Sequence, residues 1–438
     1  MTFKPNAVVV GAGYVGLTLA LHMASKGVSV LAIDTDKKKV DELQKGETPI
    51  FETGIKETLK KCVESGTLKF ATSTTEGAPF WILAISYFPG DIQHYLRVLD
   101  VIKGRNNEPP SITIRGTVPV GYIRAYLLPK LEKQFNGKLD EAFYLASAPE
   151  RSLSGAALDE LANLPQLVAG SDKSVEKVSE HFAKSGISCV SLPKLEAGEL
   201  AKCFSNFARL VQFNLANYLG ALCHQYDTSE ETMVEAIRLG YPRLNFLNVP
   251  GPGVGGFCLP KDSLVLYDGM KELEKTTHVI PSVKDFPFQA NQLNEGIIQF
   301  HAERVEEMTK NMGQILAMGV AFKGKPRTDD TRDSVGIKIV RCLMDKGRKV
   351  EVYDRTVGEI NLRNLELPIA SKPIDLQKYQ AVLLLNNDPE YKNELISMFP
   401  EKFGGAVALY DPWRLLVTGK ESIFQSAFPW QSLKMHCS

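Results

Sequence analysis

The stretch AVVVGAGYVGLTLALHMASKGVSVLAID, residues 7–34, decides the fold of the N-terminal part of this chain. It begins with an apolar strand candidate at Ala7–Val10, passes through a glycine-rich turn and continues as a helical pattern over Leu17–Lys26. A second strand candidate, Val28–Ile33, ends at Asp34. A strand, a glycine turn, a helix, a strand and an acid, in this order, form the opening unit of a doubly wound sheet.

The turn has the spacing GxGxxG, and each glycine has its own structural role. Gly11 permits the tight turn, Gly13 lets the backbone approach a pyrophosphate, and Gly16 lets helix and strand pack closely. The helix N-terminus attracts phosphate charge. An acid at Asp34 accepts hydrogen bonds from ribose hydroxyls and repels a 2′-phosphate, which favours NAD over NADP. The alternative is a glycine-rich turn that binds nothing. We expect NAD to contact Gly11, Gly13, Tyr14, Val15, Gly16 and Asp34.

Alternation of strand and helix patterns continues on both sides of a helical middle. Further strand candidates are Phe80–Ile85, Ser111–Ile114, Phe143–Ala146, Gln166–Ala169, Ile315–Val320, Lys349–Tyr353, Ala381–Leu385 and Val407–Tyr410. We therefore predict an α/β protein with two Rossmann-like doubly wound parallel-sheet domains joined by a long central helix and a helical middle domain. The expected boundaries are residues 1–193, 194–305 and 306–438.

The central helix is expected because apolar residues recur at helical intervals from about Lys194 to Leu239, with neither proline nor glycine between Glu199 and Leu219. Such a helix is longer than most globular helices. It has several apolar faces, which suit both a connection between domains and a homodimer interface.

The composition excludes several classes of protein. Lys and Arg together number 51, as do Asp and Glu, so the charge does not favour nucleic acid or a membrane surface. The seven cysteines form no CxxC pair or framework, which is typical of reduced thiols in a cytoplasmic protein. Ala7–Ala24 is apolar, but its glycines are spaced for a turn, which disfavours a signal peptide. No His/Cys cluster has the spacing of a metal site.

The stretch VPGPGVGGFCLPKD, residues 249–262, carries the strongest chemical signal. Its glycines form a loop with little side chain of its own before Cys258, and such loops bring backbone close to a ligand. Lys261 and Asp262 place a base and an acid nearby. An accessible thiol in this setting suits covalent catalysis at a carbonyl, although most cysteines are inert small hydrophobic residues.

Three weaker patterns accompany this loop. Lys202 and Asn206 are spaced to share one face of the central helix, where a solvent-facing polar stripe is the alternative. Pro149–Arg151 follows a predicted strand, where α/β sheets place their sites. Ala321–Ser334 follows the first strand of the second α/β domain and suits a phosphate, or else is a polar turn that caps a helix.

In this order, the elements resemble the UDP-glucose/GDP-mannose dehydrogenase family of nucleotide-sugar 6-dehydrogenases. The resemblance covers nearly the whole chain and rests on GAGYVG (11–16), TVPVG (117–121), PER (149–151), the Lys202/Asn206 helix, PGPGVGGFCLPKD (250–262) and AFKGKPRTDDTRDS (321–334). It implies an N-terminal NAD domain, a C-terminal UDP-sugar domain and a dimer through the middle helix. PER with PGPGVGG resembles the branch that oxidises UDP-N-acetylhexosamines, whose uronates commonly enter surface polysaccharides. Lys261-Asp262 is common in the UDP-glucose branch.

The resemblance also implies a role for individual residues. Cys258 would be the nucleophile, Lys202 would act at C6, Asn206 would hold the oxyanion, and Asp262 and Glu150 would handle water and its protons. The cofactor would further contact Lys39, Thr117 and Arg332. The substrate would contact Arg151, Arg243, Gly253, Gly255, Phe322, Lys323 and Arg414. The expected reaction takes a C6 alcohol to a uronic acid with two NAD, through a thiohemiacetal and a thioester on Cys258.

Some positions depart from the family pattern. They are Phe257 before the cysteine, Tyr218 after Asn217, Ala84–Tyr87 near the expected NAD site, and Arg115-Gly116 before Thr117. Three alternatives stay open: a UDP-glucose 6-dehydrogenase, a dehydrogenase of this architecture that performs a single oxidation, and a catalytically silent sensor of NAD or a nucleotide sugar.

Overall fold

The computed structural model of the chain describes residues 3–48, 50–87, 91–106, 108–398 and 407–416. These residues form two compact units. The first spans the chain up to Asn206 together with Asp262–Pro287, and the second spans Phe207–Lys261 together with the chain from Phe288 on. The helical segment 194–305 therefore contributes to both units. That this segment forms a separate middle domain with these boundaries stays a prediction.

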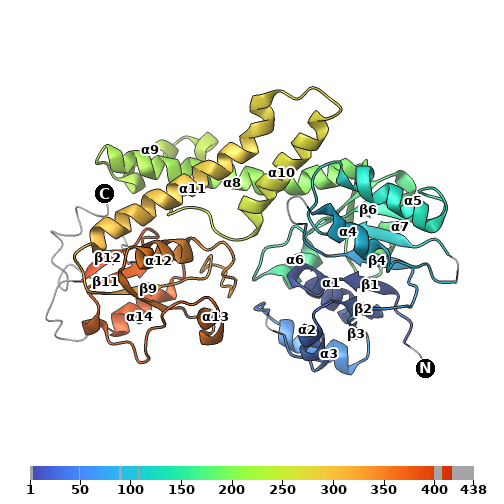
Figure 1. Ribbon diagram of the computed structural model, residues 1–438, viewed down its shortest axis with the longest axis horizontal. Coiled ribbons are helices and arrows are strands. Elements are labelled where there is room, and N and C mark those ends of the chain that lie inside the picture. The colour runs from blue at the N-terminus through green and yellow to red at the C-terminus, as the bar shows by residue number, and fades with distance from the viewer. Residues whose placement is uncertain (1–2, 49, 88–90, 107, 399–406, 417–438) are drawn as a thin grey trace. The chain divides into compact units, whose positions relative to one another are not determined.

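The first unit is built on an eight-stranded sheet of order β3-β2-β1-β4-β5-β6-β7-β8 (Figure 1). Its strands are β1 (Ala7–Val10), β2 (Val30–Ile33), β3 (Leu68–Ala71), β4 (Phe80–Leu83), β5 (Ser111–Ile114), β6 (Tyr144–Ser147), β7 (Gln166–Gly170) and β8 (Cys189–Pro193). All neighbours are parallel except β6 and β7, which run antiparallel. The first six strands have the order of a dinucleotide-binding sheet.

Helices connect these strands because parallel neighbours need a crossover. They are α1 (Tyr14–Ser25), α2 (Lys37–Gln44), α3 (Ile55–Glu64), α4 (Ile92–Leu99), the π-helical turn η1 (Ile123–Leu127), α5 (Leu128–Phe135), α6 (Ala157–Asn163) and α7 (Asp172–Ala183). Helix α1 is apolar on nearly all sides and is buried from Gly16 to Ala24. It lies in the main core with the side chains of β1 and β2, so the cofactor turn is fixed by the core itself.

Long helices form the middle of the chain. They are α8 (Leu195–Gln225), α9 (Glu230–Arg238), the short turn η2 (Pro242–Leu244), α10 (Cys258–Glu274) and α11 (Pro281–Thr309). Helix α8 has 31 residues, which confirms the long central helix. The chain passes between the two units inside α8, α10 and α11, and Pro287 lies within α11 at one of these points.

The second unit contains a four-stranded parallel sheet of order β10-β9-β11-β12. Its elements are β9 (Gln314–Met318), α12 (Val335–Asp345), β10 (Lys349–Tyr353), α13 (Glu359–Asn364), η3 (Leu376–Lys378), β11 (Ala381–Leu384), α14 (Glu390–Met398) and β12 (Ala408–Tyr410). Apolar side chains of β9, β11 and α12 form its core.

The structure confirms the predicted fold class and differs from the sequence prediction in detail. Strands β1, β5 and β10 have the predicted bounds, and the others shift by one or two residues at an end. Strands β3 and β8 were not predicted. The antiparallel β6–β7 pair, in which Ala146 lies opposite Gly170, also departs from the predicted all-parallel arrangement.

Candidate active site

The glycine turn joins β1 to α1 in the first unit. Gly11 has φ 95°, and its N–H donates to the carbonyl of Ile33 at 2.8 Å. A Cβ on Gly16 would lie 1.8 Å from the carbonyl oxygen of Gly11, so this position accepts only glycine. Gly13 caps α1 without any side-chain hydrogen bond, and the first turn carries no acid. The amides at Tyr14 and Val15 therefore lie at a helix end that favours an anionic ligand.

Asp34 lies at the end of β2, beside this turn. Its carboxylate accepts hydrogen bonds from the N–H groups of Ala12 at 2.9 Å and Asp36 at 3.0 Å. Lys39 Nζ lies 3.0 Å from Oδ2. Burial opposes the charged form, but the bonds from Asp36, Lys39 and Ala12 outweigh it and lower the pKa of Asp34. Asp34 is thus a carboxylate at neutral pH, as the prediction of a ribose-binding acid requires. Lys39, another predicted cofactor contact, pairs with this carboxylate, and its contact with the cofactor stays a prediction.

Tyr14 reveals a connection that the sequence analysis missed. Its hydroxyl bonds to the carboxylate of Glu52, which also accepts the N–H groups of Gly155 at 2.8 Å and Ala157 at 2.9 Å. Burial, and then the neighbouring Glu52, raise the pKa of Tyr14. Glu52 thereby joins the cofactor turn to the start of α6. No local pattern marks Glu52, because its partners are distant in sequence.

The loops after β4 and β5 lie side by side at the same sheet edge. A Cβ on Gly116 would lie 2.0 Å from the carbonyl of Ile85 and 2.3 Å from the hydroxyl of Tyr95. Tyr87 is fully buried and contacts Tyr122 edge to face. The departures at Ala84–Tyr87 and Gly116 are therefore mutually packed, and Thr117 follows them in the predicted cofactor loop.

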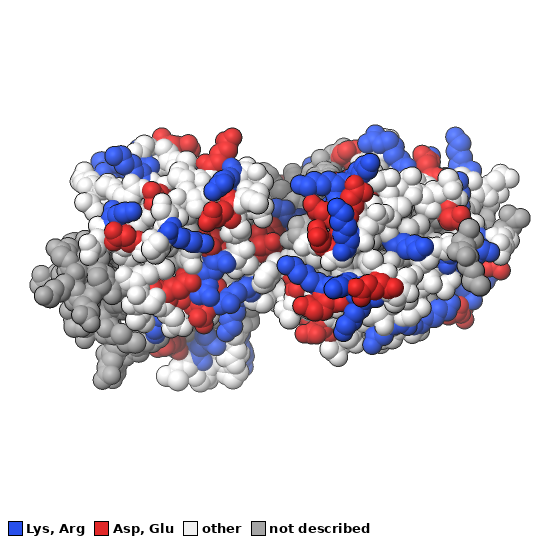
Figure 2. Space-filling view, turned by 90° about the horizontal axis from the view of Figure 1, so that it is seen from below, with Lys and Arg blue, Asp and Glu red and all other residues white. Residues whose placement is uncertain are grey.

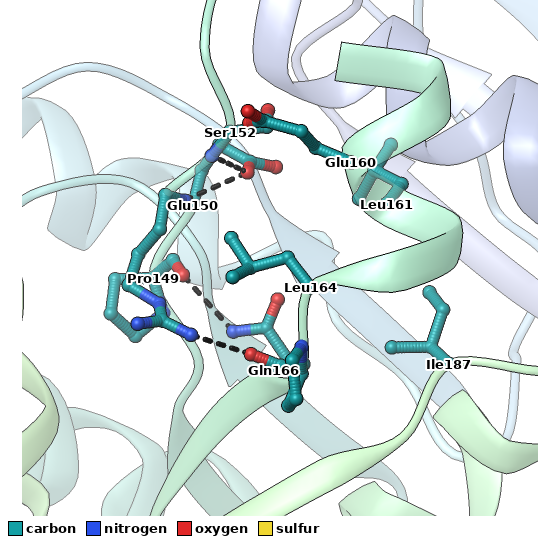
Figure 3. A pocket seen from close by; sticks show the side chains of 10 residues that line it. Pro149, Glu150, Ser152, Glu160, Leu161, Leu164, Gln166 and Ile187 are labelled. Carbon is teal, nitrogen blue, oxygen red and sulfur yellow. Dashed lines mark hydrogen bonds between the residues drawn. The ribbon is translucent and has the colours of Figure 1, made fainter. Parts of the chain in front are cut away.

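Glu150 lies in a polar cluster at the end of β6 (Figure 3). One of its carboxylate oxygens accepts the N–H groups of Arg151 at 2.7 Å and Ser152 at 2.6 Å. The other accepts a bond from the guanidinium of Arg115. Gln166 bonds to Arg115 at 2.7 Å and to the carbonyl of Pro149 at 3.0 Å. Burial lowers the pKa of Arg115 to about 9, so the group keeps its charge at neutral pH.

A recess of the first unit, which Figure 3 shows between the loop at Pro149 and helix α6, is bordered by Glu150, Ser152 and Gln166. Leu161, Leu164 and Ile187 form its apolar side. The guanidinium of Arg151, another predicted substrate contact, donates to the carbonyl of Pro165 at 2.6 Å. The recess thus has both a polar and an apolar side.

Asn206 and Asp262 meet within the first unit. The amide of Asn206 donates to the carboxylate of Asp262 at 2.6 Å, and both residues are buried. Lys202 is half-buried one turn earlier on α8, on the same face as Asn206. Three of the predicted catalytic residues therefore belong to one small region of α8 and α10.

The cysteine loop belongs to the second unit and is held by two buried asparagines. The Val254 N–H donates to Asn294 Oδ1 at 2.8 Å, and Asn294 Nδ2 donates to the Val254 carbonyl at 2.9 Å. The Gly251 N–H donates to Asn217 Oδ1 at 2.8 Å. Neither asparagine was predicted as a support of the loop. Asn294 bonds to both the N–H and the carbonyl of Val254, as a residue of a neighbouring β-strand would.

Several glycines of the cysteine loop lie against other parts of the second unit, with no room for a side chain. A Cβ on Gly253 would lie 2.4 Å from Ile298, and one on Gly255 would lie 3.0 Å from the carbonyl of Asp333. A Cβ on Gly256 would lie 2.7 Å from the ring of Phe322. The loop therefore packs closely on α11 and on the segment that precedes α12. Substrate contacts of Gly253 and Gly255, which would use their backbone, stay a prediction.

Cys258 is exposed and is the first residue of α10. The guanidinium of Arg332 lies over the ring of Phe257, 4.8 Å from its centroid. Arg332 bonds to Asp330, which is the main cause of its raised pKa, and the neighbouring Cys258 contributes less. The structure thus brings Phe257, Cys258 and Arg332 together with Phe322, and Lys323 follows Phe322 in the same loop. The departure at Phe257 provides the face on which Arg332 lies.

The other two arginines that were predicted to contact the substrate, Arg243 and Arg414, differ in their exposure and partners. Arg243 is exposed beside the ring of Tyr241. Arg414 pairs with Glu230 on α9 and donates to the carbonyl of Pro250 at 3.3 Å, so it also supports the base of the cysteine loop. Tyr218 is 48% exposed on α8.

Figure 2 shows acidic and basic side chains interspersed on the face it displays. Within the described ranges, no cluster of His, Cys, Asp and Glu could hold a metal ion. No helix among the described residues combines the length and the apolarity needed to cross a lipid bilayer. Cys437 lies outside the described residues.

The strand order, the glycine turn and the ionised Asp34 define the class as a protein with a dinucleotide-binding domain. The chain belongs to the UDP-glucose/GDP-mannose dehydrogenase family, whose NAD-binding, central and UDP-binding domains match residues 6–184, 196–286 and 316–416. It is an NAD-dependent nucleotide-sugar dehydrogenase.

Named relatives carry two activities. A UDP-N-acetyl-D-mannosamine dehydrogenase of Methanocaldococcus jannaschii is 28% identical over 397 residues, covering 88% of this chain and 86% of the relative. A UDP-glucose 6-dehydrogenase of Rickettsia typhi is 27% identical over 382 residues, covering 82% and 83%. The solved UDP-D-ManNAc dehydrogenase of Pyrococcus horikoshii shares the fold, with a TM-score of 0.76, 23% identity and coverage of 93% and 99%.

Proposed function

We propose that this protein oxidises the C6 alcohol of a UDP-N-acetylhexosamine to the uronic acid in two NAD-dependent steps. The observation that carries the proposal is Cys258, an exposed thiol at the start of α10, behind a loop fixed by Asn294 and Asn217. The PER and PGPGVGG motifs favour the hexosamine, as do the relatives named UDP-N-acetyl-D-mannosamine dehydrogenase. A product of this kind commonly enters surface polysaccharides.

The chemistry requires a covalent stage. NAD, when bound, accepts a hydride in each of the two oxidations. A free aldehyde must become tetrahedral before it can lose a second hydride, and attack by the Cys258 thiolate achieves this by forming a thiohemiacetal. Loss of hydride leaves a thioester, which water cleaves to the acid. Overall, one alcohol and one water yield one carboxylate, and two NAD are reduced.

The residues of the first unit would control charge during these steps. Lys202 would take the alcohol proton or polarise C6, and Asn206 would hold the negative oxygen that forms in each step. A single such donor is commonly worth about 3 kcal/mol. Thioester hydrolysis needs an acceptor for a water proton, and the carboxylates of Asp262 and Glu150 are the two candidates.

The remaining residues would bind the ligands. Those proposed to contact the nucleotide sugar are Arg151, Arg243, Gly253, Gly255, Phe322, Lys323 and Arg414. Lys39, Thr117 and Arg332 would add to the NAD contacts of Gly11–Gly16 and Asp34. We further propose a homodimer through α8, which exposes Leu200, Phe204 and Leu215, and a cytoplasmic location, where NAD and UDP-sugars are available.

The test is the amount of NADH formed per sugar consumed. We expect two, and a ratio of one would contradict the two-step reaction and favour a single-oxidation dehydrogenase. Cys258→Ser should stop steady formation of uronate, while Cys342→Ser, a change of a half-buried thiol on α12, should not. Absence of turnover with every UDP-sugar would instead favour a sensor.

UDP-glucose is the second candidate substrate, because Lys261-Asp262 is common in that branch and because the Rickettsia typhi relative is named for it. A panel of UDP-glucose and the UDP-N-acetylhexosamines, compared by kcat/KM, distinguishes the two. The proposal expects the highest value with a hexosamine.

A further inference from the structure

The tripeptide 386–388, Asn-Asn-Asp, lies just after β11 and contacts the loop 321–327, which follows β9. Strands β9 and β11 are parallel neighbours, so their carboxyl ends lie at the same edge of the second sheet. Asn387 Oδ1 accepts the backbone N–H groups of Gly324 at 2.7 Å and Lys325 at 3.1 Å. All of these residues belong to the second unit.

The other two residues of the tripeptide bind the same loop. The carboxylate of Asp388 is 3% exposed and accepts two bonds from the guanidinium of Arg327, at 2.9 and 3.2 Å. Asn386 Nδ2 donates to the Ala321 carbonyl at 3.3 Å. A Cβ on Gly324 would lie 2.1 Å from the backbone nitrogen of Asp388, so the two backbones touch. The loop 321–327 is therefore held at both ends and in its middle.

Backbone N–H groups of this loop already have acceptors within the protein. The Ala321 N–H donates to Asp354 Oδ2 at 2.9 Å, and the Phe322 N–H donates to the Asp330 carbonyl at 2.9 Å. Those of residues 324 and 325 donate to Asn387. A loop that binds phosphate through its backbone directs such groups at the ligand instead. These amides of the loop 321–327 are therefore committed to the fold.

Two side chains of the loop have the chemistry that a nucleotide requires. Lys323 Nζ lies 5.3 Å from the centroid of the Phe322 ring. An ammonium group meets phosphate as a point charge, and an aromatic ring offers an apolar face. The Phe322 ring also lies against the cysteine loop, since a Cβ on Gly256 would be 2.7 Å from it. The backbone that carries both side chains is the one that the tripeptide 386–388 holds.

We propose that Asn387 is a positioning residue for nucleotide recognition: it binds the loop amides internally and fixes Phe322 and Lys323, so that the loop recognises a nucleoside diphosphate through these side chains and not through its amides. This proposal rests on the proposed function, in which both residues contact the UDP-sugar. It assigns a role to the tripeptide 386–388 and names the group of the loop that meets the phosphate charge.

Calorimetric titration of the full chain with UDP tests the role of Asn387. Asn387→Ala leaves two backbone N–H groups without their acceptor, so the loop should loosen and the Kd for UDP should rise about tenfold. Asn387→Asp keeps an acceptor oxygen and should recover most of the affinity. Asn393→Ala is the matched control, because Asn393 is exposed on α14 and bonds to Glu390 at 3.2 Å. An unchanged Kd in Asn387→Ala, or equal losses in Asn387→Ala and Asn387→Asp, overturns the proposal.

Salt dependence shows which group of the loop meets the phosphate charge. The affinity of the parent for UDP should fall between about 0.05 and 0.5 M salt, because salt screens exposed charges. Lys323→Ala should bind UDP about tenfold more weakly and with a smaller salt dependence. Lys325→Ala, which changes an exposed lysine of the same loop and keeps its N–H, should change both quantities less. Equal effects of the two lysine variants would contradict recognition through Lys323.

Gly324→Ala reaches the same contact from the side of the loop. Its methyl group would displace the loop from Asp388, so UDP should bind as weakly as it does to Asn387→Ala. In turnover, both variants should raise the KM for the UDP-sugar and leave the KM for NAD unchanged. A general loss of structure would instead raise both KM values, and that result contradicts the proposal. Thermal unfolding gives the folded fraction of each variant.

The same titrations separate this inference from the proposed function. A parent protein that does not bind UDP contradicts the proposed UDP-sugar substrate itself. A parent that binds UDP, with no change in Asn387→Ala or Gly324→Ala, contradicts only the role given to Asn387.

Discussion

The sheets of the two units begin alike. In each, the first strand ends at a glycine with positive φ, Gly11 at 95° and Gly319 at 87°. The N–H of that glycine donates to the last carbonyl of the neighbouring strand, Ile33 at 2.8 Å in one sheet and Tyr353 at 2.9 Å in the other. An aspartate follows that carbonyl in both cases. The backbone of the dinucleotide switch point is therefore present twice.

The two aspartates differ in what their oxygens do. Asp354 is 5% exposed and accepts four backbone N–H groups, from Val320, Ala321, Thr356 and Val357, at 2.7 to 2.9 Å. Asp34 accepts only two, and its third bond is to the movable side chain of Lys39. Asp354 has no acceptor position left for a ribose, whereas Asp34 does. The same residue type thus serves the fold in one sheet and keeps an acceptor position open in the other.

The helices that follow differ as well. Helix α1 begins directly after the glycine turn, at Tyr14, whereas α12 begins at Val335, after a long loop that follows Gly319. That loop carries Phe322 and Arg332, which pack against the cysteine loop. Pyrophosphate binding at a helix N-terminus is therefore favoured in the first sheet, whereas in the second sheet a long loop separates the glycine from the helix.

The largest effect is expected from Asp354→Ala. Each buried N–H that loses its acceptor costs about 1–3 kcal/mol, so we expect a loss of unfolding free energy of about 4 kcal/mol. Urea unfolding measures it, and the KM for NAD should not change in the fraction that stays folded. Asp34→Ala is the matched control. A stability loss as large in Asp34→Ala would remove the distinction between the two sheets.

Gly16→Ala should be the next most severe. Its Cβ would lie 1.8 Å from the Gly11 carbonyl oxygen, so the turn must open, at a cost of about 3 kcal/mol and with loss of NAD binding. The equivalent contact in the second sheet is looser, since a Cβ on Gly336 would lie 3.1 Å from the Gly319 carbonyl. Gly336→Ala should change stability by less than about 1 kcal/mol. Calorimetric titration with NAD and thermal unfolding test both variants, and tight NAD binding by Gly16→Ala would refute the packing argument.

A smaller change is expected in cofactor choice. Asp34→Ala should raise the KM for NAD about tenfold, because a hydrogen bond to a charged group is worth about 1.5–3 kcal/mol. It should also improve the use of NADP, because the repelling carboxylate is gone and Lys39 becomes available to a 2′-phosphate. Initial rates with both cofactors measure the ratio. An unchanged ratio would mean that Asp34 does not contact the ribose.

The smallest expected effect is on the pH dependence of stability in the second unit. Burial is the main reason that the pKa of His301 on α11 is lowered to about 3. Since the folded pKa lies below the unfolded value, the stabilisation is present above about pH 6.5 and is lost as the pH falls toward the folded pKa. The slope should be about 1.4 kcal/mol per pH unit below pH 6.5. Urea unfolding at pH 7 and pH 5.5 should show a flatter dependence in His301→Gln, and equal slopes would contradict this assignment.

Local patterns predicted most of the strands and failed at the two edges of the first sheet. Strand β1 had the predicted bounds because its four buried residues form a continuous apolar run, and β10 because buried Val350 and Val352 alternate with more exposed residues. Strand β3, with Lys69 exposed between Leu68 and Phe70, has too few apolar residues to be recognised. Strand β8 is mostly exposed and is defined by its pairing with β7. These two edge strands depend on a neighbour that the local sequence does not reveal, whereas the edge strand β10 is recognisable from its own alternation.

The site shows the same limit. Motif spacing named Tyr14, Glu150 and the cysteine loop, but not the residues that bond to them. Glu52, Arg115 and Asn294 act on partners 34 or more positions away in the chain, as in the Arg115–Glu150 and Asn294–Val254 contacts. A charged residue directly after a buried strand, as Arg115 is after β5, is the one signal that could have been used. An isolated asparagine on a long helix gives none.

The paired hydrogen bonds between Asn294 and Val254 have a consequence for how the nucleophile loop opens. An irregular loop normally exchanges its amide hydrogens quickly, because it opens without the rest of the domain. Here the Val254 amide loses its hydrogen bond only when α11 opens locally at Asn294. Its rate of exchange with deuterium should therefore be close to that of the amides of α11 and slower than that of exposed loops. The loop before the reactive sulfur is, in this respect, an extension of a helix.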